Sequence, residues 1–253
     1  MEKQYMENQY IDLAGIPRVM KNPRQQIQDM IDKQDVRGLM EKAAELHGHL
    51  CSCVTLGILA GCLAVRKLGE EATDGMETVT CIIECHNCFS DGIQITTGCT
   101  FGNNALIFRD LGKNAATLIR RGGKAFRVCV HPEAKDKINA LQEKIYSGAR
   151  WLFDKVVTRR SGSAEEKEIL KTLFLRSSYD LLAIPHEELL TIQEVRVSSE
   201  EYAPIFNSHI CSLCGEKIME PRARVRGGQI MCISCAQDIF FQLDGAGISQ
   251  KTC

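Results

Sequence analysis

The chain has 253 residues, a formal net charge of −1 and 13 cysteines. This length suits one sizeable core and a small appended module. The near-neutral charge gives no global attraction for nucleic acid or an anionic membrane surface. No apolar run approaches the roughly 20 residues that span a bilayer, and the first residues lack a signal-peptide core. We therefore expect a cytoplasmic protein whose reduced thiols, odd in number, are metal ligands, catalytic groups or buried residues.

The first third of the chain is predicted to be helical after a loose lead-in at residues 1–22. Apolar residues recur at helical spacing from Pro23 to His47. Cys51–Leu68 is small and apolar and predicts a buried helix, in which Gly57 and Gly61 allow a close approach of a neighbour. That neighbour belongs either to the same chain or to a second copy in a homodimer.

Strand signals dominate the next part. The β-branched run Thr78–Glu84 predicts a central strand. A loop and a short helix around Asp91–Thr97 follow. Three strand-like segments separated by turn residues, at Ala105–Arg109, Ala115–Arg120 and Lys124–Val130, predict a three-stranded antiparallel meander.

Helical and strand patterns then alternate up to a polar linker. Helices are expected over Pro132–Tyr146, over Ala164–Arg176 and after Pro185, and a strand over Leu189–Val197. Residues 198–208 are polar and make the best linker. We therefore divide the chain into an α+β core domain, residues 1–203, and a C-terminal domain, residues 204–253.

The C-terminal domain carries two CxxC pairs separated by 17 residues, Cys211-Ser-Leu-Cys214 and Cys232-Ile-Ser-Cys235. Each pair can place two thiolates on one turn, and two pairs complete a closed zinc tetrahedron. A hairpin is expected around Gly227-Gly228 and a helix over Ala236–Leu243. These features predict a small treble-clef or zinc-ribbon module held by structural zinc.

A second ligand-rich region lies in the core domain. The heptad His47-Gly-His49-Leu-Cys51-Ser-Cys53 holds four metal-binding side chains where one helix ends and another begins. A later group contains Cys85, His86, Cys88 and Cys99. Both groups flank predicted core elements and can converge on one site. We expect His49 and Cys51 to bind metal, with His47 as a ligand or as an orienting partner.

These motifs resemble the FmdE family of formylmethanofuran dehydrogenase. HGHLC with its following apolar helix resembles the start of that family. The run Cys88–Asn103 resembles its second motif, and Leu111–Ala115, with Arg127 in the next strand, resembles its hairpin. The resemblance covers residues 35–130 and extends to the four-Cys module that some members carry.

The resemblance implies a thioredoxin-like core, a mixed sheet flanked by helices, with a site able to hold zinc. By position it singles out His47, His49, Cys51, Cys88 and Asp91. Among these we expect His49, Cys51 and Cys88 to hold zinc, with an open position, and His47 or Asp91 to carry a proton. By position it also singles out Gln94, Cys99 and Lys113. Members are linked to molybdenum or tungsten formylmethanofuran dehydrogenase, so we expect a metal-dependent enzyme or an accessory subunit in anaerobic one-carbon metabolism, with a dehydrogenase complex as protein partner.

One departure keeps two alternatives open. The family reads Cys-Pro-Gly where this chain has Cys51-Ser52-Cys53. The extra thiol suggests an iron–sulfur or redox protein using Cys51, Cys53, Cys85 and Cys88. The other alternative is a non-catalytic regulatory protein that docks onto a larger complex through its zinc module.

Overall fold

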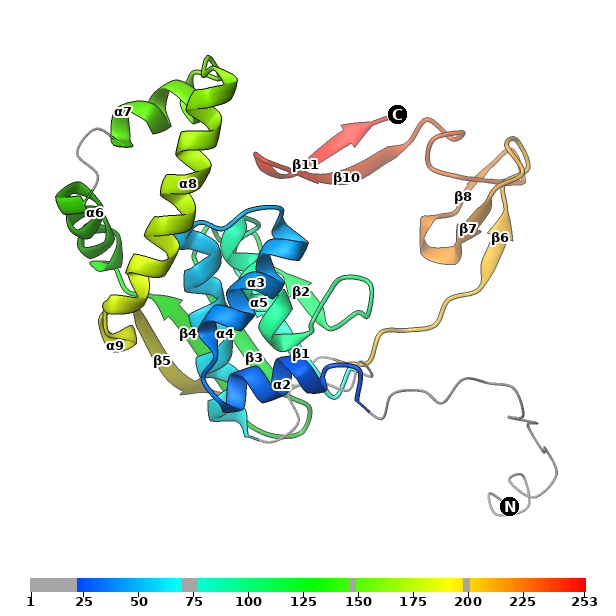
Figure 1. Ribbon diagram of the computed structural model, residues 1–253. Coiled ribbons are helices and arrows are strands. Elements are labelled where there is room, and N and C mark those ends of the chain that lie inside the picture. The colour runs from blue at the N-terminus through cyan, green and yellow to red at the C-terminus, as the bar shows by residue number, and fades with distance from the viewer. Residues whose placement is uncertain (1–21, 70–76, 146–148, 198–200) are drawn as a thin grey trace, which may run out of the picture.

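A computed structural model describes residues 22–69, 77–145, 149–197 and 201–253 (Figure 1). The core contains a mixed sheet with the strand order β2-β1-β3-β4-β5. β1 and β2 are parallel, and the other neighbours are antiparallel. The strands are β1 (Val79–Ile83), β2 (Leu106–Phe108), β3 (Ala115–Arg120), β4 (Ala125–Val130) and β5 (Leu190–Val195). The lead-in predicted at residues 1–22 lies, except for Asn22, outside the described residues.

The predicted antiparallel meander is wrong at its first strand. β2 pairs in parallel with β1, with Leu106 opposite Cys81, and β1 separates β2 from β3. The segment between β1 and β2 contains a helix, and such a crossover returns the chain parallel to its starting strand. The turn residues after β2 predict only a local reversal of the chain. They do not reveal that β1 lies between β2 and β3 in the sheet. The central place of β1 and the β3–β4 hairpin are as predicted.

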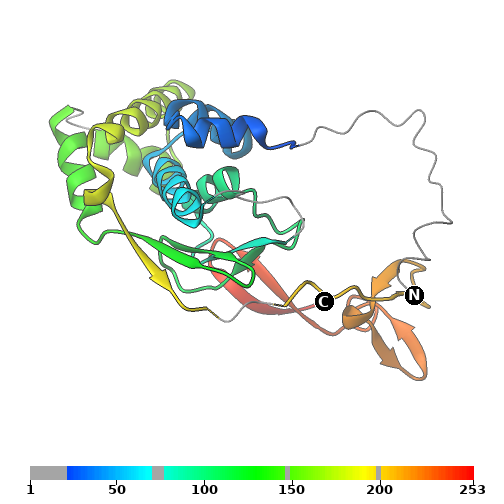
Figure 2. The ribbon, with the colours of Figure 1, turned by 90° about the horizontal axis from the view of Figure 1, so that it is seen from below.

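Helices cover one side of this sheet (Figure 2). None of the helices in the described part of the chain has the length and apolar character needed to cross a membrane. The α+β class, with a mixed sheet flanked by helices, is confirmed. The helices are α2 (Gln25–Asp32), α3 (Val36–His47), α4 (Ser52–Leu68), α5 (Cys88–Thr97), α6 (Ala134–Ile145), α7 (Ala149–Phe153), α8 (Ala164–Asp180) and α9 (His186–Leu189), with a π-helical turn at Asp154–Thr158.

The contact between α4 and α5 places the N-termini of both helices together. A side chain added at Gly57 would collide with the backbone of Phe89, and one added at Gly61 with the side chain of Thr96. Gly92 lies equally close to α4. Both helices therefore run in the same direction, with glycines at the crossing, and the close approach predicted for Gly57 and Gly61 occurs within one chain.

An ion pair joins the buried Glu84, directly after β1, to the half-buried Arg127 of β4. The guanidinium of Arg127 donates two hydrogen bonds to the carboxylate of Glu84, at 2.7 and 2.8 Å. Hydrogen bonds from Arg127 lower the pKa of Glu84. The residue Glu84 is 6% exposed, so removal of its partner would leave a buried charge.

The C-terminal domain consists of small hairpins. The hairpin predicted around Gly227-Gly228 is present, but Ala236–Leu243 is not the helix we expected. Alternating apolar residues there form a strand that turns at Gly245 and Ala246 into a second strand. This arrangement fits a zinc ribbon. The strands are β6 (Ser208–Ile210), β7 (Lys217–Met219), β8 (Arg224–Arg226), β9 (Gln229–Met231), β10 (Ile239–Asp244) and β11 (Gly247–Thr252).

Gly57→Ala should destabilise the core domain by about 1–3 kcal/mol, because the new methyl group collides with backbone and forces α4 and α5 apart. Urea unfolding followed by far-UV circular dichroism measures this. Gly102→Ala is the matched control, since its added carbon meets only Thr100 Oγ1, at 3.8 Å, and should change stability by less than about 0.5 kcal/mol. Equal stability of the two variants would contradict the close helix contact.

Arg127→Met should cost roughly 3–5 kcal/mol at pH 7, because it leaves Glu84 charged and buried without its partner. The native pair lowers the pKa of Glu84 in the folded state. Its contribution is therefore complete above the pKa of an unfolded glutamate and is lost as the pH falls through the lower folded value. The difference between wild type and variant in urea unfolding should shrink on acidification, and a difference independent of pH would contradict this role of Glu84.

Candidate metal centre

Four cysteines of the C-terminal domain converge. The sulfur atoms of Cys211, Cys214, Cys232 and Cys235 all lie within 4.8 Å of one another. The backbone N–H of Cys232 donates to the sulfur of Cys211 at 3.3 Å, as expected for a knuckle that holds a thiolate. Four thiolates fill a zinc tetrahedron and leave no open position, so the zinc that this cluster binds is structural.

A second cluster forms in the core domain from His47, Cys51 and Cys88, whose ligand atoms also lie within 4.8 Å of one another. His47 ends α3, and Gly48, with φ of 83°, turns the chain away from that helix. Cys51 is the N-cap residue of α4, and Cys88 is the first residue of α5. Three helix ends thus meet at this cluster.

Asp91, itself hydrogen-bonded to Gln94, orients the imidazole of His47. Its Nδ1 lies 2.6 Å from Asp91 Oδ2, and Gln94 Nε2 donates to Asp91 Oδ1 at 3.0 Å. His47 Nε2 is buried and makes no hydrogen bond to any residue in the described ranges. A carboxylate on one ring nitrogen and an unpartnered second nitrogen are the usual arrangement of a histidine that binds metal.

Of the three cysteines beside His47, only Cys88 is stabilised as a thiolate. Hydrogen bonds from the thiols of Cys51 and Cys53 lower the pKa of Cys88 to about 2. The same contacts raise the pKa values of Cys51 and Cys53. The positive ends of α4 and α5 also stabilise negative charge here. A charged sulfur, a second thiol and a free imidazole nitrogen are a donor set that fits zinc.

His49 and Cys53 lie beside the cluster without belonging to it. The ring of His49 is exposed and lies 4.5 Å from that of His47. Partial burial and the neighbouring His47 lower the pKa of His49. The sulfur of Cys53 lies 3.6 Å from Asn87 Oδ1. The structure therefore brings His47, in place of the predicted His49, together with Cys51 and Cys88.

The remaining predicted residues are spread around α5. Cys85 is buried at the end of β1, and burial raises its pKa to about 11. Cys99 is buried beyond the opposite end of α5, where its thiol donates to Val79 O at 3.7 Å. Lys113 is exposed, and its backbone N–H donates to Glu84 O at 3.0 Å. None of these three residues belongs to the metal-type cluster among the described residues.

Sequence reasoning overlooked Asn87. Its side chain caps α5 by accepting from the N–H of Phe89 at 3.0 Å, and donates to Asn114 Oδ1 at 2.8 Å. It therefore fixes the helix end that carries Cys88. An Asn directly before a ligand cysteine is a helix N-cap signal that could have identified it.

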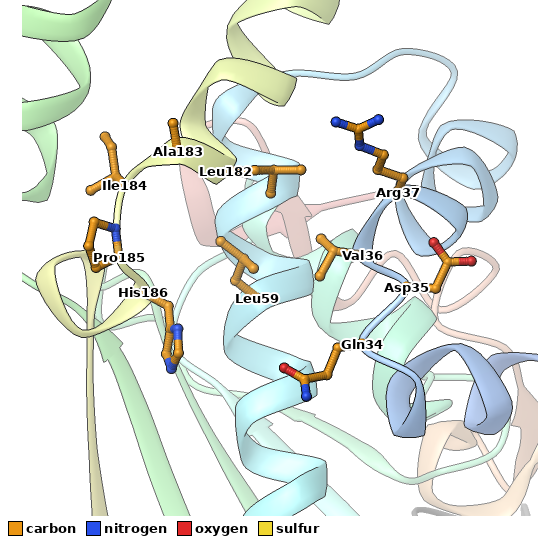
Figure 3. A pocket seen from close by; sticks show the side chains of 10 residues that line it. All are labelled: Gln34, Asp35, Val36, Arg37, Leu59, Leu182, Ala183, Ile184, Pro185 and His186. Atoms are coloured by element: carbon orange, nitrogen blue, oxygen red, sulfur yellow. The ribbon is translucent and has the colours of Figure 1, made fainter.

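Two cavities differ in their relation to this centre. One, of about 370 Å³, is lined in part by Asp91 and Gln94 and by the tip of the β10–β11 hairpin. The other, of about 540 Å³, lies between α3, α4 and the segment that leads into α9. Figure 3 shows its apolar side chains, including Leu59 and Leu182, between Arg37 and His186. It contains no predicted site residue.

The fold and the four-cysteine cluster define a metal-binding α+β protein with an appended zinc module. The chain belongs to the FmdE family. The family model described as "FmdE, Molybdenum formylmethanofuran dehydrogenase operon" matches residues 46–191, more than half of the chain. A second model, the prokaryotic dksA/traR C4-type zinc finger, matches residues 204–239. The family resemblance drawn from the motifs is thereby confirmed.

A protein of Archaeoglobus fulgidus described as a "Probable S-adenosyl-L-methionine-binding protein" is 40% identical over 215 residues. The match covers 83% of this chain and 55% of that protein, so the chain spans about half the length of this curated relative. A crystal structure of a protein from Syntrophus aciditrophicus, described as "tungsten formylmethanofuran dehydrogenase subunit e (fmde)-like", is 22% identical, with a TM-score of 0.49. That match covers 79% of this chain and 91% of the other.

Cys232→Ser should remove one zinc ion per chain and unfold the C-terminal hairpins, because structural zinc supplies much of the folding energy of so small a module. Amide hydrogen exchange measures the effect. Protection should be lost over β6 to β9 and kept in the core sheet. Ser234→Ala, a neighbouring substitution outside the ligand set, is the control. Unchanged protection of the hairpins in Cys232→Ser would contradict a structural role for this zinc.

Proposed function

We propose that the core domain binds zinc through His47, Cys51 and Cys88 as a site with an open coordination position. The observation that carries this proposal is the environment of the His47 imidazole. Its Nδ1 is bound to Asp91, whereas its Nε2 is buried and has no hydrogen-bond partner among the described residues. Three protein ligands are typical of catalytic zinc, and a fourth position remains for water or substrate.

The surrounding residues suit a metal that acts as a Lewis acid. Zinc in such a site polarises carbonyl oxygens and lowers the pKa of bound water to about 7. Asp91 accepts from Gln94 while it holds His47, so its role is to orient a ligand and to increase its basicity. His49 stands exposed beside the cluster and is the better placed of the two histidines to carry a proton to solvent.

We further propose that the chain acts as a metal-dependent enzyme or accessory subunit in one-carbon metabolism of the formylmethanofuran dehydrogenase type. Membership of the FmdE family supports this proposal. An accessory subunit assembles with another protein, so this proposal includes a protein partner. The iron–sulfur alternative is less favoured, because Cys85 does not join Cys51 and Cys88 in the cluster among the described residues.

Purified protein should contain two zinc ions per chain, and Cys51→Ala should contain one, because it removes a ligand from the core site alone. Elemental analysis of anaerobically purified protein measures the ratio. Cys62→Ala is the matched control, since Cys62 is also a half-buried cysteine of α4 but lies outside the cluster; it should keep both ions.

Two results would contradict this proposal. One is a wild-type protein that holds a single ion per chain, unchanged in Cys51→Ala. The other is a brown, iron-containing anaerobic preparation, which would favour the iron–sulfur alternative.

A further inference from the structure

The C-terminal hairpin β10–β11 reaches back to the core domain beside the candidate metal centre (Figure 1). Its tip, Leu243 to Gly245, forms one wall of the cavity of about 370 Å³. The lining also includes Asp91 and Gln94 from α5. The tip lies outside the regions matched by the two family models, residues 46–191 and 204–239.

A specific contact holds the hairpin against the core. The N–H of Ile248 donates to Asp110 Oδ2 at 3.0 Å. Gly247 is buried with φ of 101°, and a Cβ at this position would lie 2.5 Å from the same oxygen. Only glycine combines this backbone conformation with so close an approach. The sequence of the hairpin is thus adapted to its place on the core domain.

Two carboxylates line the cavity, from Asp91 and Asp244, and none of the described residues in its lining is a lysine or arginine. Asp91 is shared with His47. Asp244 accepts from neutral groups of its own hairpin, the N–H of Ala246 and the side-chain amide of Gln242. These hydrogen bonds, and after them the positive charge of Lys251, lower the pKa of Asp244, so it stays ionised and is the carboxylate that can serve a bound cation.

The rest of the cavity wall is largely apolar and aromatic. It includes Phe101 and Phe108, and the faces of aromatic rings attract cations. The imidazole of His86 also lines the cavity, with its ring 5.6 Å from that of Phe108.

We propose that the core domain and the C-terminal hairpin together form a binding site for a small organic cation with an apolar body. The volume lies within the range of small-molecule pockets. The carboxylate of Asp244 supplies the charge, and the aromatic side chains supply the apolar contact. The site is defined without the metal, so its failure would leave the proposed zinc centre untouched.

Three probes of similar shape and different charge test the ligand class. Benzylammonium should bind more tightly than benzyl alcohol by about tenfold, the effect of one charge-assisted hydrogen bond, and benzoate should bind most weakly. Ligand-observed NMR and titration calorimetry on the full chain measure this order. Preference for benzoate, or no difference among the three, would overturn the proposal.

Asp244→Asn should weaken benzylammonium binding by about tenfold and leave benzyl alcohol binding unchanged. Glu187→Gln, which removes an exposed carboxylate outside the cavity lining, should change neither. Equal benzylammonium affinity in wild type and Asp244→Asn would show that Asp244 does not supply the charge, and would overturn the proposal.

The contribution of the hairpin needs its own pair of variants. Gly247→Ala forces the hairpin away from Asp110 and should weaken benzylammonium binding by at least about tenfold. Gln250→Ala, which changes an exposed residue of β11 outside the cavity lining, should retain binding. Unchanged zinc content in both variants establishes that the module is folded. Wild-type affinity in Gly247→Ala would show that the hairpin is not a wall of the site.

Discussion

The parallel contact between α4 and α5 is the constraint on which the rest of the core site depends. Contacts advance by four residues on both helices, from Cys53 and Cys88 to Gly57 and Gly92 and then to Gly61 and Thr96. Small residues at the crossing let the backbones approach, and the common direction places both positive helix ends at the thiols. A pair of antiparallel helices would have placed Cys88 at the far end of α4.

The same packing explains why Asp91 serves His47. Cys88, Asp91 and Gln94 recur at intervals of three on α5 and lie near one another along the helix. Cys88 therefore reaches the cluster while Asp91 meets His47 from α3, and Gln94 fixes Asp91 in turn. The β1–α5–β2 crossover sets α5 beside α4, so sheet topology and site geometry are linked.

The two metal-type clusters found in the described part of the chain differ in design. The C-terminal cluster draws four thiolates from two local turns and closes on itself, which suits a structural ion. The core cluster draws three candidate ligands from three helix ends and is tied to a network of polar side chains. The first cluster is local in sequence and needs no other core, whereas the second exists only if the core domain folds.

The sequence by itself determined the elements and the identity of the ligand-rich motifs. Two CxxC pairs specify a zinc site because their spacing is nearly the whole geometry. The apolar patterns of α4 and β1 fix the extents of these two elements to within one residue. Two errors had local causes. The turn after β2 does not say which strand lies beside it, and Ala236–Leu243 contains apolar residues compatible with both helix and strand until the turn at Gly245 is weighed.

Tertiary structure alone placed His47, and not His49, in the cluster with Cys51 and Cys88. His47 and His49 are two residues apart, and nothing local separates a ligand from its neighbour. The carboxylate of Asp91, 44 residues away in the chain, orients His47 toward the thiols, while the turn at Gly48 leaves His49 exposed. The length of α5 separates Cys88, its first residue, from Cys99, which lies beyond its other end.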